Sequence, residues 1–311
     1  MNETGRFAPS PTGELHLGNL RTALLAWLFA RSRDGRFLVR LEDLDASRVR
    51  PGVAESQLGD LRALGLGWDG EVVRQSERTD LYKTALRRLR AAGLIYPCYC
   101  TRAEVRAEVA ASASAPHDGS GGFAYPGTCR NLTRTRRAER EAAGRRPTLR
   151  LNAHDAPGET AVAFQDELLG EVEGFVDDFV VRRGDGSYSY QLAVAVDDAE
   201  QDVTQVVRGA DLAFSTPRQI FLLKLLGLPV PRYAHVPLVL GPGGERLAKR
   251  DGPVGLKDHL KLGRTPEDIL RRMARSLGLP VTDGDRLPGG LLKNFTPARL
   301  PTQPTTCTAL A

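Results

Sequence analysis

A histidine follows a proline- and glycine-containing turn in the segment Arg6-Phe7-Ala8-Pro9-Ser10-Pro11-Thr12-Gly13-Glu14-Leu15-His16-Leu17-Gly18-Asn19. Residues 4–8 have the pattern of a short strand, and apolar residues recur at helical spacing over residues 20–28. The N-terminus of such a helix presents free backbone N–H groups and the positive end of its dipole, so it can bind phosphate. His16 could donate to a phosphate oxygen, and Gly18 would let a nucleotide approach the backbone closely. The same spacing also fits an ordinary turn with a surface histidine.

A basic segment follows a glycine-rich loop later in the chain. Residues 241–244 read Gly-Pro-Gly-Gly, and residues 246–250 read Arg-Leu-Ala-Lys-Arg. A mobile basic loop can fold over a triphosphate and neutralise the charge that develops at the transferred phosphorus. Lys249 suits this role as a compact charge. It is one of only six lysines among 43 basic residues, so an arginine was the more expected occupant. A solvated basic loop without a ligand has the same pattern.

Three of the four cysteines lie within a short stretch of the chain. Cys98 and Cys100 are separated by one residue, and Cys129 follows Tyr125 by four residues. Three thiolates and one further ligand would satisfy tetrahedral zinc. Buried free cysteines are the alternative, and the remaining Cys307 lies far away near the end of the chain. Four cysteines are too few for a disulfide scaffold in a chain of this length.

Arginines are concentrated between residues 130 and 150, where only Glu139 and Glu141 carry the opposite charge. The arginines are Arg130, Arg134, Arg136, Arg137, Arg140, Arg145, Arg146 and Arg150. This pattern favours contact with a nucleic-acid backbone. A helix whose charges are simply solvated is the alternative.

Three polar residues stand near the ends of expected strands. Glu42 could hold an ammonium group, and Arg208 could pair with a carboxylate through two hydrogen bonds. Tyr190 is the third residue of this kind. In open parallel sheets, ligands bind beyond the carboxyl ends of the strands. Each residue taken alone also fits a plain surface position.

Composition restricts the class of protein. The chain has 311 residues, of which 41% are hydrophobic and 26% charged, and its net charge is 43 − 38 = +5. These values indicate a folded core and permit nucleic acid as a partner without requiring it. The longest apolar run, residues 24–30, is far too short for a membrane span. We therefore expect a soluble, cytoplasmic protein.

The elements that must position these residues alternate between strands and helices, which predicts an α/β fold with a parallel sheet. Strands are expected at residues 4–8, 37–41, 192–196 and 235–240, and helices at residues 51–65, from the cap Ser76 to Gly93, at 215–227 and at 266–277. Between these halves, short strands begin at Thr148, and a hairpin turn at residues 184–186 joins strands 179–182 and 187–191. We expect a Rossmann-type domain in two parts (1–96 and 190–240), an inserted α+β domain (97–189), a loop and helical region (241–299) and a disordered tail (300–311).

Taken in order, the motifs resemble the catalytic half of class I glutamyl-tRNA synthetases from about Arg6 to about Gly255. His16 to Asn19 is similar to the HIGH signature of that family, with Asn19 in place of the second histidine. Arg246 to Arg250 is similar to the KMSKS signature, with Arg246 and Ala248 replacing the first lysine and the first serine. The other matching segments are Arg40 to Asp45, Tyr190 to Asp198, Val207 to Asp211 and Ser215 to Gln219.

The resemblance implies a Rossmann-type class I synthetase catalytic domain with an inserted α+β zinc-containing domain and a short C-terminal helical segment. It implies catalytic roles for His16, Asn19 and Lys249, and Mg²⁺ bound with ATP. The implied sites are glutamate-binding Arg6, Ala8, Ser10, Glu42, Tyr190 and Arg208; ATP-binding His16, Gly18, Asn19, Arg246, Leu247, Ala248, Lys249 and Arg250; and one structural zinc ion on Cys98, Cys100, Tyr125 and Cys129.

The implied reaction is ATP-dependent activation of L-glutamate to glutamyl-adenylate. Residues 256–311 are too few for the helical anticodon-reading domain of full-length members of the family. We therefore expect the truncated type, which transfers glutamate to the queuosine base in the anticodon of tRNA(Asp) and gives glutamyl-queuosine. A short synthetase that charges a tRNA 3′ end and a non-catalytic RNA-binding relative are the alternatives. We expect a monomer that activates glutamate without tRNA.

Overall fold

A seven-stranded sheet forms the centre of the computed structural model, which describes residues 3–111, 124–245, 247, 255–282 and 284–307. The strands lie in the order β3 (Val73–Arg74), β2 (Arg36–Leu41), β1 (Thr4–Phe7), β9 (Gln205–Gly209), β10 (Arg232–Val236), β6 (Ala161–Asp166) and β7 (Gly170–Phe175). Neighbouring strands are parallel except for the β6–β7 pair, which is antiparallel. The expected α/β fold with a mostly parallel sheet is confirmed.

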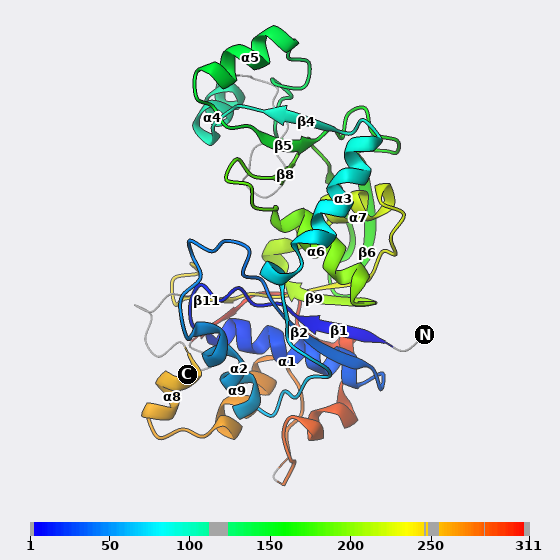
Figure 1. Ribbon diagram of the computed structural model, residues 1–311. Coiled ribbons are helices and arrows are strands. Elements are labelled where there is room, and N and C mark those ends of the chain that lie inside the picture. The colour runs from blue at the N-terminus through cyan, green and yellow to red at the C-terminus, as the bar shows by residue number, and fades with distance from the viewer. Residues whose placement is uncertain (1–2, 112–123, 246, 248–254, 283, 308–311) are drawn as a thin grey trace.

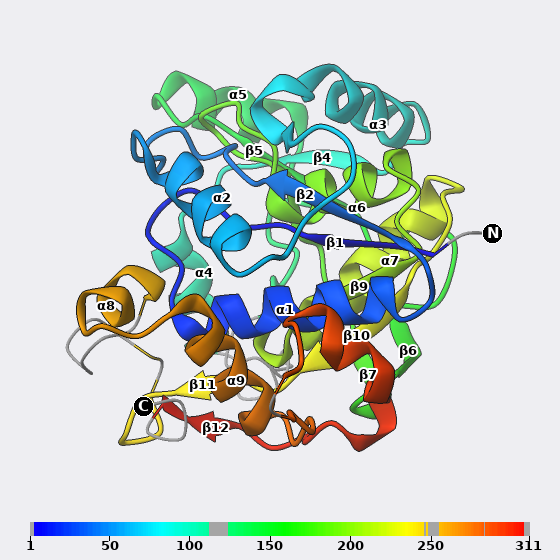
Figure 2. The ribbon, with the colours of Figure 1, turned by 90° about the horizontal axis from the view of Figure 1, so that it is seen from below.

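Helices cover both faces of this sheet (Figures 1 and 2). On one face lie α1 (Leu17–Arg31), α2 (Val53–Ala63) and α9 (Pro266–Ser276). On the other face lie α3 (Thr79–Ala91), α6 (Tyr190–Glu200) and α7 (Thr216–Leu225). Each helix layer forms its own apolar cluster with the sheet. Helix α1 is buried around its whole circumference in the first cluster, and α6 is buried along most of its length in the second. The sheet is thus held between two cores, and its strand ends are left to form a site.

The run Leu192–Val196 is a helix, so the expected strand is wrong. These residues form the middle of α6, which begins after Ser189, whose side chain accepts a hydrogen bond from the backbone N–H of Leu192. All five residues are buried because α6 packs against α7, α3 and β8. A short, continuously apolar run fits a buried helix as well as a buried strand, so periodicity could not distinguish them.

Two local expectations are also wrong. Ser76 does not cap α3, which begins at Thr79 after the 3₁₀ turn η1 (Gln75–Glu77). The Ser76 backbone and hydroxyl both donate to Asp43 instead. The turn at residues 184–186 exists, but the second expected strand is reduced to one bridge between Arg182 and Tyr188.

A second, antiparallel sheet is formed by β4 (Ile95–Cys98), β5 (Thr148–Leu151) and β8 (Val180–Arg182). It lies at the end of the molecule that also carries α4 (Arg102–Ala111) and α5 (Arg134–Ala142), as Figure 1 shows. Between β5 and β8 the chain contributes β6 and β7 to the main sheet. Residues 97–189 are therefore tied to the main sheet by two of their strands.

The last part of the described chain packs under α1. It contains β11 (Val239–Leu240), α8 (Leu256–Lys261), α9, the 3₁₀ turns η4 (Gly289–Asn294) and η5 (Pro297–Arg299), and β12 (Thr305–Thr306). Strand β12 pairs in parallel with β11, so the expected disorder from residue 300 onward is wrong for residues 300–307. Residues 308–311 lie outside the described chain.

A buried arginine joins the first helix to this late segment. Arg21 is 1% exposed, and burial lowers its pKa to about 10. It donates to the carbonyl of Pro237 at 2.7 Å and to the hydroxyls of Thr305 at 3.1 Å and Ser276 at 3.4 Å.

Within the described residues, no helix has the length and apolar character needed to cross a membrane.

Candidate active site

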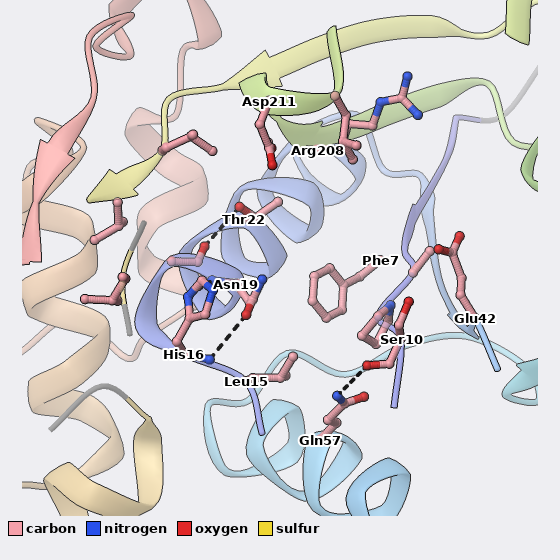
Figure 3. A pocket seen from close by; sticks show the side chains of 18 of the residues that line it. Phe7, Ser10, Leu15, His16, Asn19, Thr22, Glu42, Gln57, Arg208 and Asp211 are labelled. Atoms are coloured by element: carbon pink, nitrogen blue, oxygen red, sulfur yellow. Dashed lines mark hydrogen bonds between the residues drawn. The ribbon is translucent and has the colours of Figure 1, made fainter. Parts of the chain in front are cut away.

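A cavity of about 720 Å³ opens at the carboxyl ends of β1 and β9. From β1 the sheet continues through β2 and β3 on one side and through β9 and β10 on the other, so the strand order reverses between β1 and β9. In open α/β sheets, ligands bind in the crevice at such a point. Figure 3 shows His16 and Asn19 at the start of α1 on one side of this cavity, with Ser10 and Glu42 on the other. One crevice thus brings together the two ends of the sequence motif that runs from Arg6 to Asn19.

His16 is the N-cap of α1 and is fixed in one tautomer. Its Nδ1 accepts from the backbone N–H of Asn19 at 3.2 Å, and the Asn19 side chain accepts from the backbone N–H of His16 at 3.3 Å. Since Nδ1 accepts, the neutral ring carries its proton on Nε2. Burial lowers the pKa of His16, which Asp211 only partly opposes, so the ring is neutral. Gly18 makes room for it, because a Cβ there would lie 3.0 Å from the ring.

Arg6 and Glu42 line the cavity and contact two buried residues that do not, Arg40 and Asp198. Arg6, which is 3% exposed, donates to Asp198 at 3.1 Å and to the carbonyl of Val207 at 3.3 Å. Arg40 pairs with Asp198 at 2.8 Å and lies 3.6 Å from Glu42. Burial raises the pKa of Glu42 to about 7, against the lowering effect of Arg40 and Arg6. Glu42 is therefore a carboxylate whose charge is poorly compensated until a cation reaches it.

Arg208 is held by four side chains. Its Nη1 donates to Gln219 at 2.8 Å and to the Tyr190 hydroxyl at 3.4 Å, and its Nη2 donates to Thr216 at 2.7 Å. Its Nε donates to His235 at 3.1 Å. Arg208 and Tyr190 both line the cavity, and burial raises the pKa of the Tyr190 hydroxyl. The weak contact to Tyr190 lies where a ligand carboxylate could take over as acceptor.

The structure brings the expected substrate residues together wherever it describes them. The expected residues that line this cavity are Arg6, Ala8, Ser10, His16, Gly18, Asn19, Glu42, Tyr190, Arg208 and Leu247. Arg246, Ala248, Lys249 and Arg250 lie outside the described residues. Gly255, just after them, pairs with His16 in an isolated bridge. Leu247 therefore lies at the cavity itself, and Gly255 lies beside His16, one of the residues that line it.

The three cysteines expected to bind metal converge. The sulfur atoms of Cys98, Cys100 and Cys129 lie within 4.8 Å of one another. The Tyr125 hydroxyl lies 3.3 Å from the sulfur of Cys98 and 3.6 Å from that of Cys100. Sulfur ligands around one tetrahedral zinc ion would be separated by about 3.8 Å, given a Zn–S bond of about 2.3 Å. The donor set therefore fits a closed tetrahedral metal site.

The carboxylate of Asp177 connects this cluster to α7. It accepts from the backbone N–H of Tyr125 at 2.9 Å and from Arg218 at 2.8 Å. Arg218 lies between Thr216 and Gln219, which both contact Arg208. Helix α7 thus contacts both Asp177 beside the cysteine cluster and Arg208 of the cavity.

The arginine-rich stretch divides into two groups. Arg130, Arg145 and Arg150 are used within the fold: Arg130 pairs with Asp178, Arg145 pairs with Glu104, and Arg150 stacks 3.7 Å from the centre of the Tyr125 ring. The second group lies on the exposed helix α5, with Arg134, Arg136, Arg137 and Arg140, and just beyond that helix, with the exposed Arg146. Neither Arg136 nor Arg140 forms an ion pair with any residue that the structure describes.

Sequence reasoning missed the residues that hold the binding groups. Asp198 follows an apolar run as part of Asp197-Asp198, and this buried acidic pair near the end of α6 was the available signal. Asp197 accepts from Gln75, Arg78 and Tyr82 at 2.7–2.8 Å. Asp166 and His235 carried no signal, because nothing in the sequence indicates that two strands so far apart in the chain lie side by side.

The chain is similar to proteins of known activity. Residues 4–298 match the family model for tRNA synthetases class I (E and Q), catalytic domain. The glutamyl-Q tRNA(Asp) synthetase of Nocardia farcinica is 58% identical over 300 residues, which cover 96% of this chain and 91% of that protein. The corresponding protein of Symbiobacterium thermophilum is 50% identical over 312 residues, covering 96% and 94%. The crystal structure of a glutamate-tRNA synthetase from Elizabethkingia anophelis matches with a TM-score of 0.81 and 27% identity, and it covers 100% of this chain and 69% of that one.

Proposed function

Because this chain belongs to the family of class I (E and Q) tRNA synthetases, we propose that its cavity binds L-glutamate and ATP and joins them as glutamyl-adenylate. The chain is a ligase of this class, with the glutamyl-Q tRNA(Asp) synthetase function of the relatives that it matches over nearly their full length. The observation that carries the proposal is that the residues expected to bind glutamate, as far as they are described, all line the cavity that begins at the N-terminus of α1.

Glutamate carries two carboxylates and one ammonium, and the cavity offers matching groups. Buried Arg6 and Arg208 supply two cations, and Glu42 supplies the anion. Ala8 and Ser10 lie between them on the segment that leaves β1. Since a charge-assisted hydrogen bond is the strong kind, this arrangement favours a substrate with three charged groups over the neutral side chain of glutamine.

ATP belongs at the His16 side of the cavity. The first turn of α1 presents backbone N–H groups and a positive dipole end to the phosphates. His16, with its proton on Nε2, can donate to a phosphate oxygen without adding a fixed positive charge. We assign Gly18, Asn19 and Leu247 to the same subsite, together with Arg246, Ala248, Lys249 and Arg250 of the basic segment.

The first step is in-line displacement at the α-phosphorus. An oxygen of the substrate α-carboxylate forms a bond to that phosphorus, and the bond to pyrophosphate breaks. Little proton transfer is required, so binding geometry and charge stabilisation by His16, Asn19 and Lys249 do most of the work. A hydroxyl of the queuosine ring then attacks the carbonyl carbon of the adenylate, loses its proton, and AMP leaves. Mg²⁺ bound with ATP would balance the phosphate charge.

One structural zinc ion would occupy the site of Cys98, Cys100, Tyr125 and Cys129. Four protein donors leave no position for water, so the metal would stabilise the fold of residues 97–189 rather than act on substrate. We assign the exposed arginines of α5 to contacts with the tRNA backbone, since clustered arginine suits phosphate. The proposal also includes a division into domains: catalytic parts at 1–96 and 190–240, an inserted domain at 97–189 between them, and a C-terminal region at 241–299. It further includes a monomeric state.

Transfer of radioactive glutamate to tRNA(Asp) tests the function. Queuosine-containing tRNA(Asp) should be labelled, and the same tRNA made without queuosine should not. Periodate treatment of the queuosine diol should abolish labelling, whereas blocking the 3′ end alone should not. Labelling that disappears when only the 3′ end is blocked would show a synthetase that charges the terminal ribose. Absence of glutamate-dependent ATP–pyrophosphate exchange, with and without tRNA, would show a non-catalytic protein.

A further inference from the structure

Behind Arg208 lies a buried chain of hydrogen bonds that no substrate reaches. Arg208 Nε donates to His235 Nε2 at 3.1 Å, and His235 Nδ1 lies 2.6 Å from Asp166 Oδ2. His235 is fully buried and Asp166 is 1% exposed. The three residues lie on the adjacent parallel strands β9, β10 and β6. Neither His235 nor Asp166 lines the cavity, so any effect on substrate must pass through Arg208.

The charge of Arg208 fixes the tautomer of His235. A guanidinium Nε–H can only donate, so His235 Nε2 must accept. The neutral imidazole then carries its proton on Nδ1, where it donates to Asp166. Burial lowers the pKa of His235, which keeps the ring neutral. A protonated ring would turn a second N–H toward Arg208, and the chain of hydrogen bonds would be broken at that point.

Asp166 is in turn fixed by the backbone. Its Oδ1 accepts from the N–H groups of Leu168 at 3.0 Å and Leu169 at 2.9 Å, in the turn between β6 and β7. The backbone N–H of His235 lies within 3.2 Å of both carboxylate oxygens. Burial acts to raise the pKa of Asp166, but the hydrogen bonds from His235 and these amides lower it overall. The carboxylate is therefore ionised and cannot rotate freely.

We propose that Asp166 and His235 are positioning residues that set the orientation of Arg208 toward the substrate carboxylate. This inference rests on the proposed function, because it gives Arg208 a substrate to bind. Gln219 and Thr216 hold the Nη atoms, and the Asp166–His235 pair holds Nε. With three sides of the guanidinium fixed by protein, the carboxylate meets an arginine that loses little side-chain entropy on binding.

Replacing Asp166 by asparagine tests the inference through the tautomer. In the Asp166→Asn variant, the amide oxygen should stay with the backbone N–H groups of Leu168 and Leu169. The amide NH₂ would then face His235 Nδ1, force that atom to accept and move the ring proton to Nε2. That proton would oppose the Nε–H of Arg208 and compete with Arg208 Nη2 for the Thr216 hydroxyl oxygen, which lies 3.1 Å from His235 Nε2. The KM for glutamate in ATP–pyrophosphate exchange should rise roughly ten- to a hundredfold, with kcat and the KM for ATP little changed.

A double-mutant cycle separates positioning from a purely structural role. In an Arg208→Lys background, which lacks the Nε–H, Asp166→Asn should raise the KM for glutamate no further. Equal effects in both backgrounds would overturn the proposal. Asp178→Asn is the matched control. Like Asp166, this aspartate is 1% exposed and accepts from a backbone N–H, but its side-chain donors are Tyr96 and Arg130, and it does not line the cavity. Its KM for glutamate should equal that of the wild type.

Nitrogen-15 NMR of the histidine rings keeps the test open if Asp166→Asn does not fold. In the wild type, His235 should be the Nδ1–H tautomer, and an Nε2–H tautomer would overturn the inference. The proposed function fails separately, by the absence of glutamate-dependent exchange in the wild type. Normal exchange together with an unchanged KM in a folded Asp166→Asn variant would reject the positioning role alone.

Discussion

Replacing Glu42 by glutamine should make the protein more stable and a poorer binder of glutamate. The Glu42 side chain is only 11% exposed and lies 3.6 Å from Arg40, yet its pKa is raised, chiefly by burial. The nearby carboxylates of Asp198 and Asp197 also oppose its charge. In the proposed complex, the substrate ammonium compensates that charge. Without substrate, the fold carries a carboxylate that would be better solvated in the unfolded chain.

The magnitude follows from the shift. The pKa rises from 4.5 to about 7. At about 1.36 kcal/mol per unit, the fold disfavours the ionised form by about 3 kcal/mol. A raised carboxyl pKa means that the folded chain holds a proton that the unfolded chain has already lost. The contribution of Glu42 to the stability of the wild type therefore falls as pH rises from about 4.5 to about 7 and is constant above that. Glutamine, which resembles the neutral acid, avoids this loss.

Chemical denaturation at about pH 5 and about pH 8 measures the effect. Glu42→Gln should exceed the wild type by up to about 3 kcal/mol at the higher pH and by much less at the lower one. Its KM for glutamate should rise roughly tenfold or more, because a charged partner of the ammonium is lost. Glu55→Gln, an exposed carboxylate on α2, is the control and should change stability by less than about 0.5 kcal/mol. Equal stabilisation of Glu42→Gln at both pH values would refute the reasoning.

Three further predictions concern the metal, the basic segment and the tRNA surface. Freshly purified protein should contain about one zinc ion per chain, and Cys98→Ser should lose it, as elemental analysis would show; wild-type protein free of zinc would reject the site. Lys249→Ala should cost about 2–4 kcal/mol of transition-state stabilisation, seen as lower kcat with little change in KM for glutamate, and Lys249→Arg should be nearly as impaired if the compact ammonium is needed; an active Lys249→Arg would show that any positive charge suffices. The double variant Arg136→Glu/Arg140→Glu should raise the KM for tRNA and weaken the salt dependence of that KM, while ATP–pyrophosphate exchange without tRNA stays unchanged. Arg90→Glu, a charge reversal at an exposed position on α3, is the control. If both variants had the same KM for tRNA, α5 would not be part of the tRNA interface.

Local signals in the sequence were enough to predict the turn at Arg6–Asn19 and the grouping of cysteines. His16 and Asn19 cap each other across one helical turn, and Cys98 and Cys100 are neighbours, so their relations are set by nearby residues. The sequence also predicted that Glu42 and Arg208 stand near strand ends, and the ends of parallel strands meet at one edge. These inferences needed only the period of a strand or helix and the rule for where parallel sheets bind ligands.

Expectations failed where packing between distant segments decides the structure. Leu192–Val196 could have been a strand or a helix, and only the contacts of α6 with α3 and α7 distinguish them. Thr305–Thr306 has no apolar pattern of its own and becomes a strand only because β11 offers it an edge. His235 pairs with Asp166 only because β10 and β6, which are far apart in the sequence, lie side by side in the sheet. Such pairs leave no trace in a single sequence.

The contacts of Arg21 have a consequence for how the protein is made. Residue 21 leaves the ribosome early, but its three hydrogen-bond partners are residues 237, 276 and 305. A buried cation without its acceptors is costly, so α1 cannot settle in its final place while the chain is still being translated. The cavity lining includes Val239 and Leu240, and β12 pairs with both of them. A chain that ends before residue 305 therefore lacks one acceptor of Arg21 and the partner strand of β11, and proteases should cleave it faster than the full chain.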